Sequence, residues 1–164
     1  MYLSTKTFQD FPCAHRQYRH NGNCSFVHGY SRSFTLTFSA KQQDRCGFVV
    51  DFGDLKWLRH WLEDKFDHTL LIEDEDPLLE DFIRLNAAGG CKLIQPPYGV
   101  GMEGSARWVL EVAQAGLDAR TDPYREVKVL SVEARENQKN SAIYYNPEVA
   151  SRLILALPAA AQTE

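Results

Sequence analysis

Apolar and polar residues alternate along several stretches of the chain, which is the pattern of strands with one buried face. The clearest case is the second predicted strand, in which Phe34, Leu36 and Phe38 are separated by serine and threonine residues. A polar turn containing a glycine then leads into a short third strand, so these two strands should form a hairpin. Four strands are predicted in total, at residues 2–11, 28–40, 48–50 and 126–136.

The spacing of apolar residues changes to three and four after the predicted hairpin, which is the spacing of a helix with one buried face. Leu55, Leu58 and Leu62 show this spacing first, and Asp51 or Asp54 can cap the helix. Three helices are predicted, at residues 54–62, 77–85 and 102–115. This order of elements predicts an α+β fold, in which an antiparallel four-stranded sheet has helices packed on one face.

Composition and charge narrow the class of protein. A chain of 164 residues, 44% of them hydrophobic, can bury a core, so we expect residues 1–150 to form a single domain and the alanine-rich tail 151–164 to be frayed. The net charge of −4 favours neither nucleic acid nor an anionic membrane, and no apolar run reaches the roughly 20 residues of a bilayer span. The 4 cysteines form no CxxC pair, so we expect a cytoplasmic protein with reduced thiols.

Two thiols and two imidazoles fall close together in the sequence, at Cys13, His15, Cys24 and His28. Sulfur and imidazole bind zinc, and both carry out nucleophilic or proton-transfer chemistry at neutral pH. If the first strand extends this far, Cys13 and His15 share one of its faces. His28 and Tyr30 share the parity of the buried face of the second strand, so they should continue that face beyond its apolar part.

A carboxylate ends the apolar face of the last predicted strand, because Glu136 shares the parity of Val132 and Ala134. An acid in this position is costly unless a ligand or a capping group pairs with it. The acidic stretch 73–76, in contrast, is predicted to be a solvated loop. Taken singly, each of these features has an ordinary structural explanation, such as a buried cysteine or a hydrogen-bonded histidine.

Taken together and in order, these residues resemble the 6-pyruvoyltetrahydropterin synthase and 6-carboxytetrahydropterin synthase family over residues 1–146. The matching segments are residues 14–16, 24–29, 50–56, 66–71, 103–108 and 136–144. The resemblance implies a tunnelling fold, whose sheets join into a barrel when subunits assemble. It also implies a homo-oligomer, usually a hexamer of two stacked trimers, with active sites between subunits.

The resemblance further implies a role for each matched residue. His15 and His28 would bind zinc, Cys24 would be the catalytic base, and Asp67 with His68 would relay protons. The implied substrate-binding residues are Glu136, Glu103 and Arg16, with Arg19 and Arg32 as further candidates for contact with a triphosphate.

The chain departs from the family pattern at the third zinc ligand, where Tyr30 replaces a histidine. A phenol must lose a proton with an ordinary pKa of about 10 before it binds a metal well. Three alternatives follow: Tyr30 binds zinc as a phenolate, Cys13 replaces it, or the metal site is weakened or lost. The start of the third predicted helix also departs, with Met102-Glu103-Gly104 in place of the usual Thr-x-Glu-Asn.

The short gap between Cys24 and His28 resembles the 6-carboxytetrahydropterin synthases of queuosine biosynthesis. The implied reaction converts 7,8-dihydroneopterin triphosphate to 6-carboxy-5,6,7,8-tetrahydropterin and releases acetaldehyde and triphosphate. The alternatives are a 6-pyruvoyltetrahydropterin synthase or another dihydropterin side-chain lyase, and a non-catalytic pterin-binding protein.

Overall fold

A computed structural model describes residues 1–120 and 126–149 of the chain. The strands are β1 (Tyr2–His15), β2 (His28–Ala40), β3 (Thr69–Leu71), β4 (Leu93–Ile94), β5 (Val127–Arg135) and β6 (Ser141–Tyr145). The α-helices are α1 (Lys56–Phe66), α2 (Leu79–Ala87) and α3 (Met102–Asp118), and short 3-10 turns cover η1 (Asn23–Ser25) and η2 (Phe52–Leu55). The predicted tail 151–164 lies outside the described residues.

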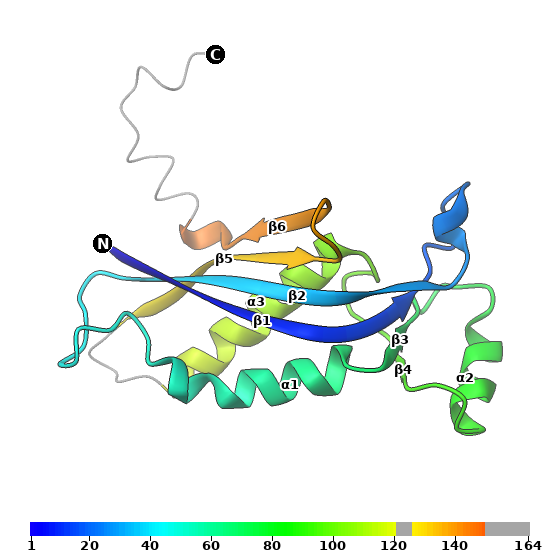
Figure 1. Cartoon of the computed structure of the whole chain (residues 1–164), viewed down its shortest axis with the longest axis horizontal. Coiled ribbons are helices and arrows are strands. Elements are labelled where there is room, and N and C mark those ends of the chain that lie inside the picture. The colour runs from blue at the N-terminus through cyan, green and yellow to red at the C-terminus, as the bar shows by residue number, and fades with distance from the viewer. Residues whose placement is uncertain (121–125, 150–164) are drawn as a thin grey trace, which may run out of the picture.

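The strands form one sheet in the order β4-β3-β1-β2-β5-β6 (Figure 1). This confirms the α+β class, but the prediction of a four-stranded antiparallel sheet was wrong in two respects. The sheet has six strands, and β3 runs parallel to both β1 and β4. β3 and β4 have only three and two residues, which is too short for an alternating pattern to reveal them.

The third predicted strand, at residues 48–50, is not a strand. The Asp44 carboxylate accepts hydrogen bonds from the backbone N–H groups of Cys46 and Phe48, each at 2.8 Å. These bonds close a turn on the side chain of Asp44, so the segment folds on itself and no hairpin forms with β2. The partner of β2 on that side is β5, which comes from the far end of the chain.

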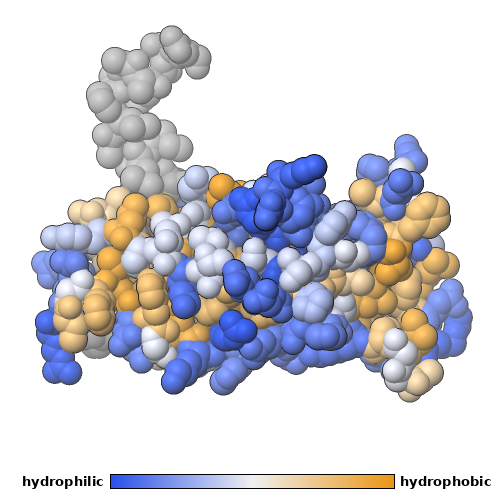
Figure 2. Space-filling view, in the orientation of Figure 1, coloured by the Kyte–Doolittle hydropathy of each residue, from blue (hydrophilic) through white to orange (hydrophobic). Residues whose placement is uncertain are grey.

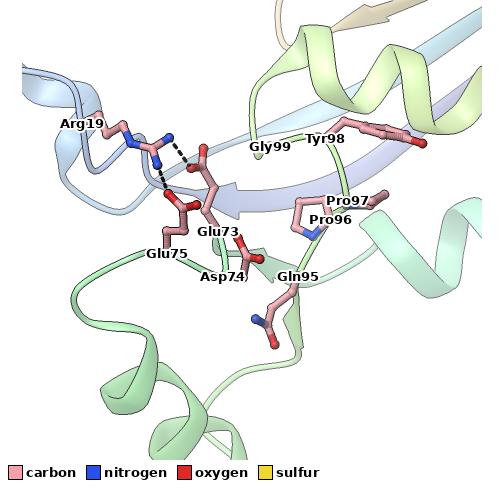
Figure 3. A pocket seen from close by; sticks show the side chains of 9 residues that line it. All are labelled: Arg19, Glu73, Asp74, Glu75, Gln95, Pro96, Pro97, Tyr98 and Gly99. Atoms are coloured by element: carbon pink, nitrogen blue, oxygen red, sulfur yellow. Dashed lines mark hydrogen bonds and ion pairs between the residues drawn. The ribbon is translucent and has the colours of Figure 1, made fainter.

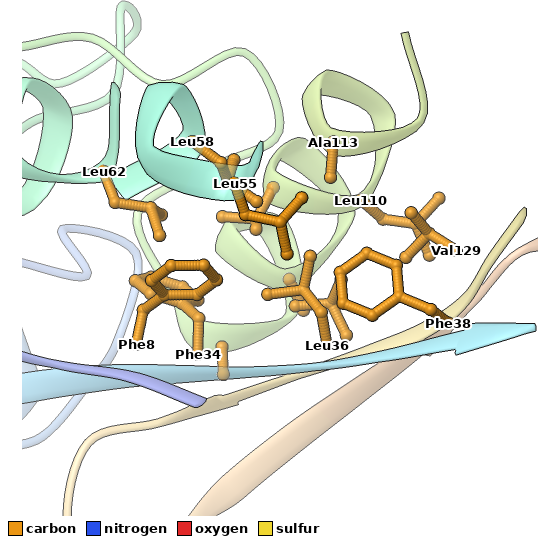
Figure 4. Close-up of a cluster of buried hydrophobic side chains, with 14 of the residues drawn as sticks. Phe8, Phe34, Leu36, Phe38, Leu55, Leu58, Leu62, Leu110, Ala113 and Val129 are labelled. Atoms are coloured by element: carbon orange, nitrogen blue, oxygen red, sulfur yellow. The ribbon is translucent and has the colours of Figure 1, made fainter. Parts of the chain in front are cut away.

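Helices α1 and α3 pack against one face of the sheet, as predicted (Figure 4). The core between the layers includes Phe8, Phe34, Leu36, Phe38 and Val129 from the sheet and Leu55, Leu58, Leu62, Leu110 and Ala113 from the helical layer. Both long helices extend beyond their predicted ends, to Phe66 and Asp118. None of the helices in the described ranges is long and apolar enough to cross a membrane.

A β-bulge in β1 determines which side chains of this strand face the helices. Phe8 pairs with Phe34 and Phe11 pairs with Arg32, so β1 takes three steps where β2 takes two. The extra residue is accommodated at Asp10, which has a φ of 73°. Beyond the bulge the odd-numbered residues of β1 face the helices, in line with the even-numbered residues of β2.

The surface is divided between polar and apolar regions. In the orientation of Figure 1, hydrophilic residues gather around the β5–β6 turn, and apolar residues gather at the end of the molecule where β2 begins and α2 lies (Figure 2). Exposed apolar side chains in this second region include Phe26 and Val27, directly before β2.

Candidate active site

The two histidines predicted to bind a metal lie opposite each other at the end of the β1–β2 pair. His15 pairs with His28 in the sheet register, and their ring centroids are 4.4 Å apart. The Nδ1 atom of His28 lies 2.8 Å from the backbone carbonyl oxygen of Phe26, and it must donate there because a carbonyl only accepts. This bond leaves Nε2 of His28 as a lone-pair donor, which is the usual arrangement of a metal-binding histidine.

His15 is only 4% exposed, and its buried Nδ1 atom has no hydrogen-bond partner. Burial lowers the pKa of His15 to about 3, and the positive charges of Arg32 and His28 act in the same direction. The imidazole is therefore neutral at physiological pH, which is the form that binds metals. An unpartnered, neutral imidazole beside a second oriented imidazole fits a zinc site.

The low pKa of His15 predicts how the stability of the metal-free protein depends on pH. Between about 6.5, the ordinary value, and about 3, the unfolded chain binds a proton that the folded chain does not. We therefore expect His15 to add no pH dependence to the free energy of unfolding above this range and to lower that free energy as the pH falls through it. Urea unfolding at several pH values should show a smaller decrease for His15→Gln, and an equal decrease in both proteins would contradict the assignment.

Two side chains compete to complete the histidine pair. Tyr30 is 41% exposed, and its ring lies edge-on to that of His28 with centroids 6.0 Å apart. Cys13 is buried, and its sulfur accepts a hydrogen bond from the Thr69 hydroxyl at 3.6 Å. Burial raises the pKa of Cys13, which disfavours the thiolate that zinc would require.

No group of three or more histidine, cysteine or acidic side chains is placed to hold a metal in the part of the chain that the structure describes. The two histidines and Cys13 are therefore not arranged as a ready-made site. Cys13 and Tyr30 lie opposite each other in the sheet register, two residues from the histidine pair, so both stay candidates for a third ligand.

Cys24 lies in the 3-10 turn η1, in the segment that joins β1 to β2. Its thiol is free and exposed, and its backbone carbonyl accepts a hydrogen bond from the N–H of Gln17 at 2.8 Å. This bond closes the segment on itself just after His15. The predicted base is thereby held at the same end of the sheet as the histidine pair.

The predicted relay residues form a pair of their own after α1. Nδ1 of the His68 ring lies 2.7 Å from the Asp67 carboxylate. The backbone N–H of His68 donates to the backbone carbonyl oxygen of Pro12 at 2.7 Å. The His68 side chain is 82% exposed. Together with Ala14 and Ser31 it lines a shallow hollow of about 430 Å³. Ala14 and Ser31 point away from the helices, because their neighbours along each strand point toward the helices.

In residues 1–120 and 126–149, no hydrogen bond or ion pair joins Cys24 to Asp67 or His68. The structure therefore brings Asp67 and His68 into direct contact with each other and shows no such contact of either with Cys24 among these residues.

The arginines expected to contact a triphosphate lie in different environments. Arg16 forms an ion pair with buried Asp76 at 3.1 Å, and Arg19 pairs with Glu73 at 3.3 Å and with Glu75. The acidic stretch 73–76 is therefore not simply a solvated loop. Arg19, Glu73 and Glu75 help to line a pocket of about 560 Å³. Figure 3 shows the arginine joined to both carboxylates.

Arg32 was expected near a triphosphate, but its side chain is 1% exposed and is buried between the sheet and helix α3. Burial lowers the pKa of its guanidinium, and the nearby Cys13, Glu136 and Glu103 partly offset this effect. Glu136 follows β5 one step beyond the Ser33–Arg135 pair, which places it opposite Arg32. The carboxylate of Glu136 acts on this buried cation only through its charge, and it accepts a hydrogen bond from the side-chain amide of Asn140 at 3.3 Å. The sequence signal for the burial of Arg32 was its even-numbered position in β2, which it shares with the buried Phe34 and Leu36.

Comparisons with known proteins agree with this architecture. The sequence matches the family described as 6-pyruvoyl tetrahydropterin synthase over residues 4–147. A 6-carboxy-5,6,7,8-tetrahydropterin synthase from Rickettsia typhi is 37% identical over 68 residues, which are 41% of this chain and 49% of that protein. One from Bacillus subtilis is 42% identical over 55 residues, covering 34% and 36% of the two chains. The match thus spans about half the length, or less, of these curated relatives.

Solved structures show the same fold. An uncharacterised protein from Wolinella succinogenes aligns with a TM-score of 0.75 and 23% identity, over 88% of this chain and 98% of that one. A 6-pyruvoyltetrahydropterin synthase from Plasmodium vivax aligns with a TM-score of 0.60 and 16% identity, over 89% and 99%. The expected tunnelling fold is thereby confirmed for the single chain. With a family match that covers most of its length, the chain belongs to the 6-pyruvoyl tetrahydropterin synthase family.

Proposed function

We propose that this protein is a zinc-dependent 6-carboxytetrahydropterin synthase of queuosine biosynthesis. The reaction would convert 7,8-dihydroneopterin triphosphate and one water to 6-carboxy-5,6,7,8-tetrahydropterin, acetaldehyde and triphosphate. The observation that carries the proposal is the facing pair His15 and His28, whose metal-binding nitrogens are left free by the protein. The names of the curated relatives and the short gap between Cys24 and His28 favour the carboxy product.

Zinc would be held by His15, His28 and Tyr30, and when bound it would polarise the side-chain oxygens of the substrate. Cys24 would remove a proton from an adjacent carbon, since its thiol is free and exposed in the segment between the two histidines. Glu136 and Glu103 would bind the pterin, because a carboxylate can accept two hydrogen bonds from an aminopyrimidine edge.

Asp67 and His68 would act on a substrate bound by a neighbouring subunit. Their pair is already formed and exposed, and Asp67 orients the imidazole through Nδ1. The two residues share no hydrogen bond or ion pair with Cys24 among the described residues, as expected for an active site shared between chains. The exposed Phe26 and Val27 beside that segment support the same interpretation, because apolar side chains of this size are usually covered at an interface. We propose a homo-oligomer, a hexamer built as a dimer of trimers, in the cytoplasm.

The test is a product assay by mass spectrometry with 7,8-dihydroneopterin triphosphate and purified protein, with and without added zinc. We expect 6-carboxytetrahydropterin and acetaldehyde in equal amounts, with a rate that zinc increases. A pyruvoyl product would assign the protein to the other branch of the family. Binding of the substrate without turnover at any zinc concentration would contradict catalysis and leave a pterin-binding function.

A further inference from the structure

Arg32 is a cation in the interior of the protein, between strand β2 and helix α3. Its Nη1 atom donates to the hydroxyl of Ser105 at 2.7 Å, and its Nη2 atom donates to the carbonyl oxygen of Val100 at 2.8 Å. Ser105 and Val100 are both fully buried. The guanidinium therefore ties the strand that carries His28 to the beginning of α3.

The two acceptors lie on either side of the turn that begins α3, residues 101–104, which carries Glu103. This turn is tightly packed: a Cβ atom at Gly101 would lie 2.8 Å from the side-chain nitrogen of Gln17 and 3.1 Å from a carboxylate oxygen of Glu103. The Glu103 carboxylate thus lies over Gly101, beside the segment that carries Cys24. On the other side, a Cβ at Gly104 would collide with the carbonyl oxygen of Tyr98, in the loop that precedes α3 (Figure 3).

Burying the charge of Arg32 costs free energy, which indicates that its two hydrogen bonds to Ser105 and Val100 have a function. These two hydrogen bonds are called the tie below. No carboxylate of the described residues forms a direct ion pair with Arg32, and its buried Nε has no hydrogen-bond partner. A buried charge without a direct partner is expensive, and an apolar side chain of similar volume is often the more stable choice. What the guanidinium provides and an apolar side chain cannot is a pair of directed bonds to the two ends of the Glu103 turn.

We propose that Arg32 is a positioning residue that, through Val100 and Ser105, fixes the turn that presents Glu103 to the pterin. This inference rests on the proposed function, because it takes Glu103 as a pterin-binding residue. Under this proposal Arg32, and not the bound metal, orients the start of α3.

A double-mutant cycle tests the proposal. Ser105→Ala removes one bond of the tie, Glu103→Gln removes the charge of the carboxylate, and the third variant combines both. Affinity is measured by fluorescence titration with neopterin, an oxidised pterin that needs no turnover. We expect Ser105→Ala to weaken binding roughly 10-fold, the effect of one hydrogen bond to a charged group. Because the tie acts through Glu103, we expect it to weaken binding much less when Glu103→Gln is already present.

Two further variants serve as controls. Ser39→Ala removes another buried serine hydroxyl, which is bonded to the carbonyl oxygen of Lys128 in a different part of the sheet, and should leave neopterin affinity unchanged. Arg32→Lys keeps the charge but cannot reach both acceptors, so it should resemble Ser105→Ala. Thermal unfolding of all variants checks that they are folded.

The possible outcomes are distinct. Suppose that the wild type binds neopterin and that the fold-changes in affinity of Ser105→Ala and Glu103→Gln multiply in the double variant. Arg32 then does not act through Glu103, and the inference is wrong. If the wild type binds no pterin, the proposed function fails and the inference fails with it. A loss in Ser105→Ala that disappears in the Glu103→Gln background supports both.

Discussion

Replacing Cys24 with alanine is expected to lower the turnover of 7,8-dihydroneopterin triphosphate by roughly 10²- to 10⁴-fold, the usual contribution of a positioned acid or base. The free thiol is exposed in the segment that joins the two histidine-bearing strands, and alanine removes it without disturbing the backbone bond between Gln17 and Cys24. Pterin binding should survive, because Glu136 and Glu103 belong to other elements. Acetaldehyde release and neopterin titration measure the two properties separately.

The matched control is Cys46→Ala. Cys46 is also a free, exposed thiol, but it lies in the turn closed by Asp44, away from β1 and β2 at their histidine end. Its replacement should leave both turnover and binding unchanged. Unchanged turnover in Cys24→Ala would remove Cys24 from the mechanism, whereas equal losses in both cysteine variants would point to a general effect of thiol removal.

Replacing His28 with alanine is expected to abolish zinc binding and, with it, turnover. Loss of an outer-shell partner already lowers metal affinity by roughly 10- to 100-fold, and loss of a direct ligand should exceed that. Zinc content after dialysis, measured by atomic absorption, gives the result without an activity assay. His60→Ala is the control, since His60 is exposed on α1 and should not affect zinc content. Retained zinc in His28→Ala would mean that the facing imidazoles do not form the site.

The third ligand is decided by two further variants. Tyr30→Phe removes the phenol but keeps the ring beside His28, and Cys13→Ala removes the buried thiol. We expect the zinc affinity to fall in Tyr30→Phe and to remain in Cys13→Ala. The opposite result would assign the third ligand to Cys13, and unchanged zinc affinity in both variants would leave a site with only the two histidines.

The elements that could be predicted from the sequence were those whose pattern repeats often enough to be recognised. Strand β2 and helices α1 and α3 bury one face over many residues, so their apolar spacing was sufficient. β3 and β4 consist of a few residues held by their neighbours in the sheet, and the apolar run at 48–50 follows a turn closed by the carboxylate of Asp44 in place of forming a strand. Short elements depend on tertiary contacts that no local pattern records.

The same distinction applies to the candidate site. Strand parity correctly placed Cys13 and His15 on one buried face of β1, but Tyr30, predicted to continue the buried face of β2, is 41% exposed. Parity could not show that Arg32, on that face, binds to α3, because its partners Val100 and Ser105 are far away in the sequence. Nor could it show that the Asp67–His68 pair lies next to β1, where the backbone N–H of His68 donates to the carbonyl oxygen of Pro12, because this depends on where β3 joins the sheet.

The bulge at Asp10 has a consequence for how this strand is aligned with its relatives. If Asp10 were removed, the strand could run straight, and Phe8 and His15 would still lie opposite Phe34 and His28. A relative without the bulge would therefore have one residue fewer here and the same face of the strand toward the helices. Its alignment with this chain needs a one-residue gap at position 10, and an ungapped alignment would match His15 to a residue on the wrong side of the sheet.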